Sequence, residues 1–125
     1  MANFFLDNDD IQFLFDHIDL GELARVQEDD FADAREHNVD YAPVDEADAI
    51  DNYRRILEIV GDIAGNTISP RAEQIDAEGN TLNEDGTVTL HPLVQDNLHT
   101  LSQADLMGFM LPPKYGGSIK PIRSA

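Results

Sequence analysis

Apolar residues recur every three or four positions along much of this chain, the spacing of one face of an α-helix. The longest such stretch runs from Glu46 to about Ser69. Its apolar positions are Ile50, Tyr53, Ile56, Leu57, Val60, Ile63, Ala64, Thr67 and Ile68. Proline lacks an amide proton and crowds the preceding turn, so Pro70 is expected to end or kink this helix, with a further turn through Ile75.

Gly61 and Gly65 lie four residues apart and therefore share one face of this long helix. Glycine in a helix costs about 1 kcal/mol relative to alanine. We interpret the pair as packing positions, where another helix approaches closely, rather than as ligand contacts.

Two shorter helical stretches are predicted in the first 45 residues. Asn8 or Asp9 can cap the first, whose apolar stripe consists of Ile11, Leu14, Phe15 and Ile18. Gly21 is expected to end it, and a second helical stretch is expected from Glu22. In that stretch we expect Leu23, Val26 and Phe31 to face inward and Glu28, Asp29 and Asp30 to lie in solvent. A loop follows, and Asp45 is the expected cap of the long helix.

Helical spacing is lost after Asp76, where glycine and asparagine accumulate. A small hairpin is expected at residues 81–90, with its turn at Asp85-Gly86. Pro92 suits the first turn of a helix whose inward positions are Leu93, Val94, Leu98 and Leu101. A last short turn, capped by Ser102 or Asp105, is expected to carry Leu106, Met107, Phe109 and Met110 toward the core.

The fold class expected from these elements is all-α, with four to five helices and a small hairpin near residues 81–90. Three segments are predicted: an acidic helical extension at 1–45, a helical domain at 46–117 and a tail at 118–125. The chain has 125 residues and 42% hydrophobic residues, enough for one domain with its own core. No apolar run reaches the roughly 18 residues of a membrane span, and no cysteine is present. Together with the absence of a secretory signal pattern, these features favour a cytoplasmic protein.

The formal net charge of −17 produces a field that repels nucleic acids, so we expect no nucleic-acid partner. Eighteen of the 25 acidic residues precede Asn66. Only Arg25, Arg35, Arg54 and Arg55 oppose them there. Such a surface favours solubility, and it can alternatively serve as a docking face for a basic partner.

Candidate chemistry is sparse, and we predict no catalytic, cofactor-binding or metal-binding residue. A calcium loop with Gly86 or Gly79 at its sixth position would lack an aspartate first and a glutamate last. The histidines, His17, His37, His91 and His99, have no zinc-site spacing. No serine lies in a glycine-flanked elbow, and Gly116-Gly117 belongs to no phosphate-binding loop.

The order of features nevertheless resembles the N-terminal helical domain of the acyl-CoA dehydrogenase family. In that family a helix ending in "P-x-A-x-x-x-D" precedes a second helix and an apolar run into "P-x-x-Y-G-G". Pro70, Ala72 and Asp76 match the first motif. The second is matched by Gly108, Phe109, Pro112, Tyr115, Gly116 and Gly117. The resemblance covers residues 46–117, and "NEDGTVTLHP" is similar to the larger branch, which includes 3-methylthiopropanoyl-CoA dehydrogenase. Pro113 and Lys114 depart from the acidic residues common there, and "SIKPIRSA" differs from the usual entry to the next helix.

The resemblance implies a truncated N-terminal domain of an FAD-dependent enzyme that oxidises an acyl-CoA thioester to the 2,3-enoyl-CoA. In the family a glutamate of a later domain removes the α-proton, hydride passes to the flavin, and an electron-transfer flavoprotein accepts the electrons. The implied partners of the full-length parent are therefore acyl-CoA, FAD, electron-transfer flavoprotein and further copies of the chain. We expect no FAD on this fragment, which is itself inactive, and we give Pro70 and the residues of the second motif structural roles. The alternative hypothesis is a stand-alone acidic helical module for protein interaction.

Overall fold

The computed structural model describes residues 2–117. In this part of the chain, five helices have eight or more residues: α1 (Asp9–His17), α2 (Leu20–Gln27), α4 (Glu46–Asp62), α5 (Ser69–Glu78) and α6 (Pro92–Gln103). A single turn forms α3 (Ala32–Arg35), and β1 (Thr81–Leu82) pairs antiparallel with β2 (Val88–Thr89). The predicted helical fold with a small hairpin is thus confirmed. The divisions after residues 45 and 117 stay predictions, and the tail lies outside the described residues.

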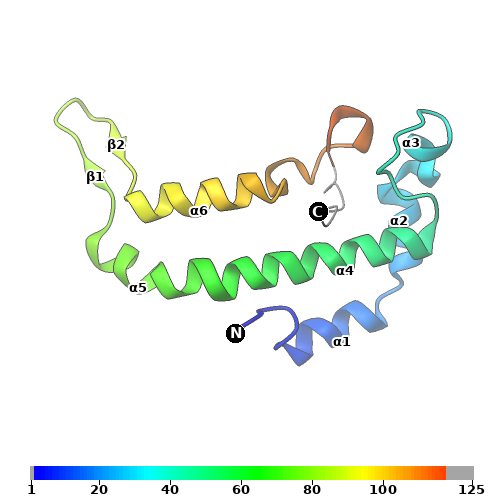
Figure 1. The fold of residues 1–125 in the computed structure, drawn as a ribbon, viewed down its shortest axis with the longest axis horizontal. Helices are drawn as coiled ribbons and strands as arrows, with labels where there is room; N and C mark the ends of the chain where they lie inside the picture. Colours follow the sequence, from blue (N-terminus) through cyan, green and yellow to red (C-terminus); the bar gives the residue numbers. More distant parts are fainter. Residues whose placement is uncertain (1, 118–125) are drawn as a thin grey trace.

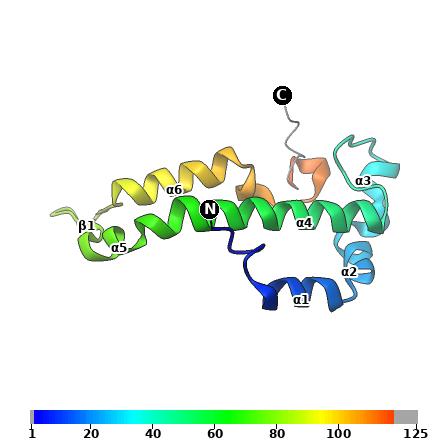
Figure 2. The same ribbon diagram turned by 60° about the horizontal axis from the view of Figure 1, so that its bottom comes forward.

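The helices α4 and α5 form one long rod around which the other elements are arranged (Figure 1). The hairpin reverses the chain, and α6 returns antiparallel along one side of the rod. The N-terminal segment and α1 lie on the opposite side, as Figure 2 also shows. Near the start of the rod, α2 packs against α4. The rod therefore has neighbours on two sides and no layer that encloses it.

Pro70 was expected to end or kink the long helix, with a further turn through Ile75; the rod does not end there, but the regular α-helix is interrupted just before Pro70 and continues beyond Ile75. A π-helical segment, Ile63–Ile68, joins α4 to α5, and Pro70 lies in the first turn of α5. Because α5 continues directly from helical residues, the missing amide proton of Pro70 removes one backbone hydrogen bond that an uninterrupted helix would make there. In the preceding π-helical turn the backbone hydrogen bonds span five residues instead of four. This difference lies where the ring of Pro70 would clash with a carbonyl of a regular α-helix.

The first two helices are separated at Ile18 and Asp19, and not at Gly21 as the sequence suggested. Asn8 Oδ1 accepts the amide proton of Ile11 at 3.1 Å and caps α1 as expected. Asp19 Oδ1 accepts that of Glu22 at 3.2 Å, so α2 begins at Leu20 and includes Gly21. An aspartate at the N-cap stabilises the start of a helix, and this effect of Asp19 outweighs the tendency of Gly21 to interrupt one.

The apolar residues of α1 and α2 face the core less than their spacing suggested. Leu23 and Val26 were expected to face inward but are 54% and 78% exposed. The small Ala24 is instead fully buried where α2 approaches α4, and Phe31 is buried as predicted. On α1, only Phe15 of the predicted stripe is partly buried, in an edge-on contact with Phe5.

Gly61 and Gly65 are packing positions, but the neighbour is the N-terminal segment and not another helix. A Cβ atom at Gly61 would lie 2.2 Å from Asn3 Oδ1 and 2.7 Å from the amide nitrogen of Phe5. At Gly65 it would lie 2.5 Å from the carbonyl oxygen of Ala2. The missing side chains let the backbone of the N-terminal segment lie directly on the rod, and the Phe4 amide donates to the Gly61 carbonyl at 3.0 Å.

The core is thin. Among the described residues the buried hydrophobic side chains are Phe5, Ala24, Phe31, Ala42, Ala49, Ile63 and Leu106. The final turn contributes only Leu106, whereas Met107, Phe109 and Met110, also expected in the core, are 65%, 55% and 76% exposed. The accessible surface is 8740 Å², against about 6,700 Å² for a compact monomer of this mass. Much apolar surface therefore has no covering layer within the described part of the chain.

The start of α6 is fixed by a histidine instead of a typical capping residue. His91 Nδ1 accepts the amide proton of Leu93 at 3.1 Å, so the ring proton lies on Nε2, which donates to Glu78 at 2.8 Å. This hydrogen bond from His91, with another from Gln74, lowers the pKa of the Glu78 carboxyl. The buried His91 side chain thus ties the end of α5 to the start of α6 across the hairpin.

Candidate functional site

The residues matched by the second motif form one turn at the end of the described chain, while Pro70 lies far from them in α5 (Figure 1). The Pro112 carbonyl accepts the amide protons of Tyr115 at 3.0 Å and Gly117 at 3.2 Å. Gly116 has a φ of 83°, which favours glycine. A Cβ atom at Gly117 would lie 1.8 Å from the carbonyl oxygen of Leu111. Both glycines are therefore required by the geometry of the turn.

This turn is attached to the region around α3. The Tyr41 hydroxyl donates to the carbonyl of Pro113 at 2.5 Å, and the Lys114 amide donates to Asp33 Oδ2 at 2.9 Å. The two aromatic residues of the motif, Phe109 and Tyr115, are 55% and 73% exposed. The attachment is made by backbone groups and by side chains from the loop, so the two aromatic rings remain on the surface.

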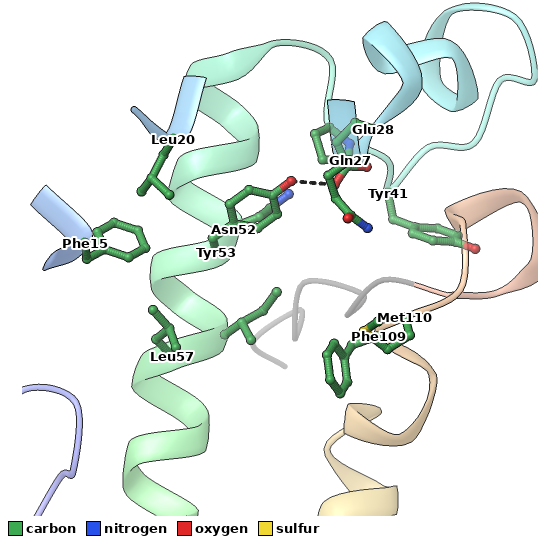
Figure 3. A pocket seen from close by; sticks show the side chains of 12 residues that line it. Phe15, Leu20, Gln27, Glu28, Tyr41, Asn52, Tyr53, Leu57, Phe109 and Met110 are labelled. Carbon is green, nitrogen blue, oxygen red and sulfur yellow. Dashed lines mark hydrogen bonds between the residues drawn. The ribbon is translucent and has the colours of Figure 1, made fainter. Parts of the chain in front are cut away.

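An apolar groove of about 390 Å³ lies between α2, α4 and the segment before this turn. Figure 3 shows Phe109 and Met110 facing Leu57 and Tyr53 of α4 across it, with Tyr41 nearby. Its remaining lining residues are Phe15, Leu20, Gln27, Glu28, Pro43, Asn52 and Ile56. The volume lies in the range of small-molecule and side-chain pockets, roughly 300–1,000 Å³.

One end of the groove carries a half-buried carboxylate, Glu28, at the C-terminus of α2. The Tyr53 hydroxyl of α4 donates to Glu28 Oε1 at 2.7 Å (Figure 3). Burial raises the pKa of Glu28 and outweighs the lowering effect of this hydrogen bond, and Asp33 adds repulsion in the same direction. The pKa of Tyr53 is also raised, first by burial and then by its carboxylate partner, so the hydroxyl keeps its proton.

Sequence reasoning missed this pair. Glu28 was assigned to a solvated acidic run, whereas Tyr53 was correctly expected on the inward face of the long helix. A hydrogen bond between them depends on how α2 crosses α4, and an acidic triplet at a helix end carries no signal of that crossing. The packing face of α2 was also predicted wrongly, because its buried residue is Ala24 and not Leu23 or Val26.

Replacing Glu28 with glutamine is expected to stabilise the fold at neutral pH. The raised pKa means that the folded state holds the proton more tightly, so Glu28 disfavours folding increasingly as pH rises above its ordinary value of 4.5. A negative charge at a helix C-terminus adds to this cost. Glutamine retains an oxygen that can accept from Tyr53.

Chemical denaturation of both proteins between pH 4 and pH 7 measures the effect. The E28Q variant should be the more stable at pH 7, and its advantage should shrink as the pH falls toward and below 4.5. An advantage that is absent at pH 7, or that grows on acidification, would contradict the assignment of a half-buried charge.

The groove does not suit a flavin dinucleotide or a metal ion. No lysine or arginine lines it, and Glu28 would repel the diphosphate of FAD. Among residues 2–117, no three His, Cys, Asp or Glu side chains are grouped so that they could hold a metal ion. What the groove offers is an apolar surface, two amide side chains, Gln27 and Asn52, and one carboxylate.

The structure is thus mostly helical and carries the exposed apolar groove described above. Comparisons of this chain with protein-family models, with curated proteins and with solved structures found no match. None of the helices described here is long and apolar enough to cross a membrane.

Proposed function

We propose that this chain is the N-terminal helical domain of an FAD-dependent, cytoplasmic acyl-CoA dehydrogenase of the larger branch. The parent enzyme oxidises an acyl-CoA thioester to the 2,3-enoyl-CoA, assembles as a homo-oligomer and passes electrons to an electron-transfer flavoprotein. The proposal is motivated by the motifs in residues 46–117, which begin in the long helix and end in the turn at Gly117.

The observation that carries the proposal is the exposure of the motif-bearing segment. Its large apolar residues Met107, Phe109, Met110, Leu111 and Tyr115 are between 53% and 76% exposed. Contiguous apolar patches of this kind mark surfaces that another protein element covers. Backbone hydrogen bonds and the two glycines keep the turn closed, so the side chains are presented by a defined structure.

In this assignment the domain has a structural role. The groove does not fit FAD, and no catalytic residue is assigned to the chain. The rod and the final turn provide apolar surface against which the flavin-binding and base-bearing domains of the parent pack.

The coding sequence beyond Ala125, read in all three frames, tests the assignment. It should encode the flavin-binding β-domain and a later helical domain. A natural stop at Ala125 with neither domain downstream would contradict it. A flavin absorbance spectrum of the purified chain gives a second test, because stoichiometric bound FAD would refute the structural role.

A further inference from the structure

The groove described above is mostly apolar but carries one negatively charged side chain, Glu28. Filling an apolar groove with apolar groups needs no charge, and a half-buried carboxylate opposes folding unless a cation compensates it. Glu28 nevertheless lies at one end, held in place by Tyr53 at 2.7 Å. Its location at the contact between α2 and α4 fixes it relative to the apolar wall of Leu57, Phe109 and Met110.

No lysine or arginine in residues 2–117 forms an ion pair with Glu28. The ion pairs of these cations are Arg25 with Glu46, Arg54 with Asp16, Arg55 with Asp51, and Lys114 with Asp33. The charge of Asp33 adds repulsion and raises the pKa of Glu28. Among residues 2–117 the Glu28 carboxylate thus has no complementary cation and is held only by the Tyr53 hydroxyl.

The charge of the whole chain favours a basic partner over a second copy. A net charge of −17 makes two copies repel each other, and it attracts a cationic segment toward the acidic N-terminal half. Beside the groove, the surface of α2 also combines acidic and apolar side chains. Asp19 and Glu22 lie there next to the exposed Leu23 and Val26. Apolar anchors flanked by cations are what a basic amphipathic helix presents.

We propose that this groove binds a basic amphipathic helix of a partner protein, with apolar side chains seated against Leu57, Phe109 and Met110 and a lysine or arginine paired with Glu28. The aliphatic stem of the basic side chain lies along Tyr53, and its charged end reaches the carboxylate. A volume of about 390 Å³ accommodates a few side chains, so the helix itself lies across the rim. This proposal does not rest on the dehydrogenase assignment. In that assignment later domains of a parent enzyme would cover the same Phe109 and Met110, so the test uses the 125-residue chain, in which both side chains are exposed.

The probe is a fluorescein-labelled amphipathic peptide of about 15 residues, built from leucine and lysine with leucines at helical spacing. Fluorescence anisotropy is measured against the purified chain at ~0.15 M ionic strength. A second peptide carries acetyl-lysine at every lysine position, which removes the charge and keeps the stem. We expect the lysine peptide to bind at least tenfold more tightly than the acetylated one.

Two pairs of variants separate the groove from general attraction to an acidic protein. E28Q should weaken binding about tenfold, because it removes one charge-assisted contact. E84Q removes one exposed carboxylate from the hairpin turn and should change binding less than twofold. Met110→Asp, in the groove wall, should weaken binding about tenfold, whereas Met107→Asp, which is outside the lining, should have little effect.

Because Met110 and Met107 are both exposed, neither variant is expected to unfold the chain. E28Q should be at least as stable as the unchanged protein, so weaker binding by E28Q cannot be attributed to loss of the fold. Equal effects of E28Q and E84Q, or equal affinity for the two peptides, would overturn the proposal. Sedimentation supplies a further test, in which the chain is compared with M110D, with M107D and with added lysine peptide. A dimer that is lost in M110D, kept in M107D and not displaced by the peptide would show that a second copy fills the groove, and would overturn the proposal.

Discussion

Replacing Ile63 with alanine is expected to lower the free energy of unfolding by about 2–5 kcal/mol, the range for large-to-small changes in a core. Ile63 and Leu106 are the two buried members of a cluster that joins the rod to α6 and the final turn. The partly buried residues around them are Ile56, Ile59, Ile68, Leu101 and Ala104. Domains of this size have a total stability of about 5–15 kcal/mol, so this loss is a large fraction of it.

Urea denaturation followed by circular dichroism measures the change. The matched control is Ile11→Ala, the same substitution at a position on α1 that is 40% exposed. It should cost less than about 1 kcal/mol. Similar losses at the two positions would contradict the packing of α6 against the middle of the rod.

Replacing Gly61 with alanine is expected to destabilise the fold by about 2 kcal/mol, although alanine is the better helix former by about 1 kcal/mol. The new Cβ atom would overlap Asn3 Oδ1 and the backbone of Phe5. Asn3 cannot simply rotate away, because its Nδ2 donates to the Glu58 carbonyl at 3.0 Å and its Oδ1 accepts from Phe5 at 3.0 Å. The N-terminal segment therefore has to leave the rod, which exposes Phe5, a side chain whose burial is worth about 1.5–3 kcal/mol.

Gly21→Ala supplies the matched control with the opposite expected sign. There the new Cβ atom would lie 2.7 Å from a carboxylate oxygen at the end of the Glu46 side chain. This flexible side chain forms a solvent-exposed ion pair with Arg25, so it can shift at little cost. The substitution should raise stability by up to about 1 kcal/mol through helix propensity. Hydrogen exchange at the Phe4 amide, which bonds to Gly61, should be faster in Gly61→Ala only. Stabilisation by both substitutions would contradict the close contact between the N-terminus and the rod.

Local signals in the sequence predicted the starts of α1, α4 and α6 and the hairpin, but not the start of α2. Asn8 and Asp45 cap helices as expected, Pro92 begins α6, and the strands pair across the Asp85-Gly86 turn. Each of these depends on a few neighbouring residues whose side-chain chemistry decides the outcome. The continuation of the rod past Pro70 was less predictable, because it involves a π-helical turn before the proline, and no short sequence signal announces such a turn.

Exposure could not be predicted from spacing. A periodic apolar stripe indicates that a face is suited to burial, but it does not say whether the same chain covers it. Val26, Phe109 and Met110 have such positions and remain on the surface. The groove was missed for the same reason, since it forms only where residues from α2, α4 and the final segment meet. Of the groove, only the part contributed by the long helix could be placed beforehand, namely Tyr53, Ile56 and Leu57 on its apolar face.

Acyl-CoA-dependent reduction of an electron acceptor is the most direct test of the assignment to the acyl-CoA dehydrogenases. The protein to assay is produced from the coding sequence extended downstream of Ala125, beside the 125-residue chain itself. We expect the extended protein to contain FAD and to reduce the acceptor when acyl-CoA is added, and the 125-residue chain to do neither. An extended protein that binds no flavin and leaves the acceptor oxidised with acyl-CoA would contradict the account.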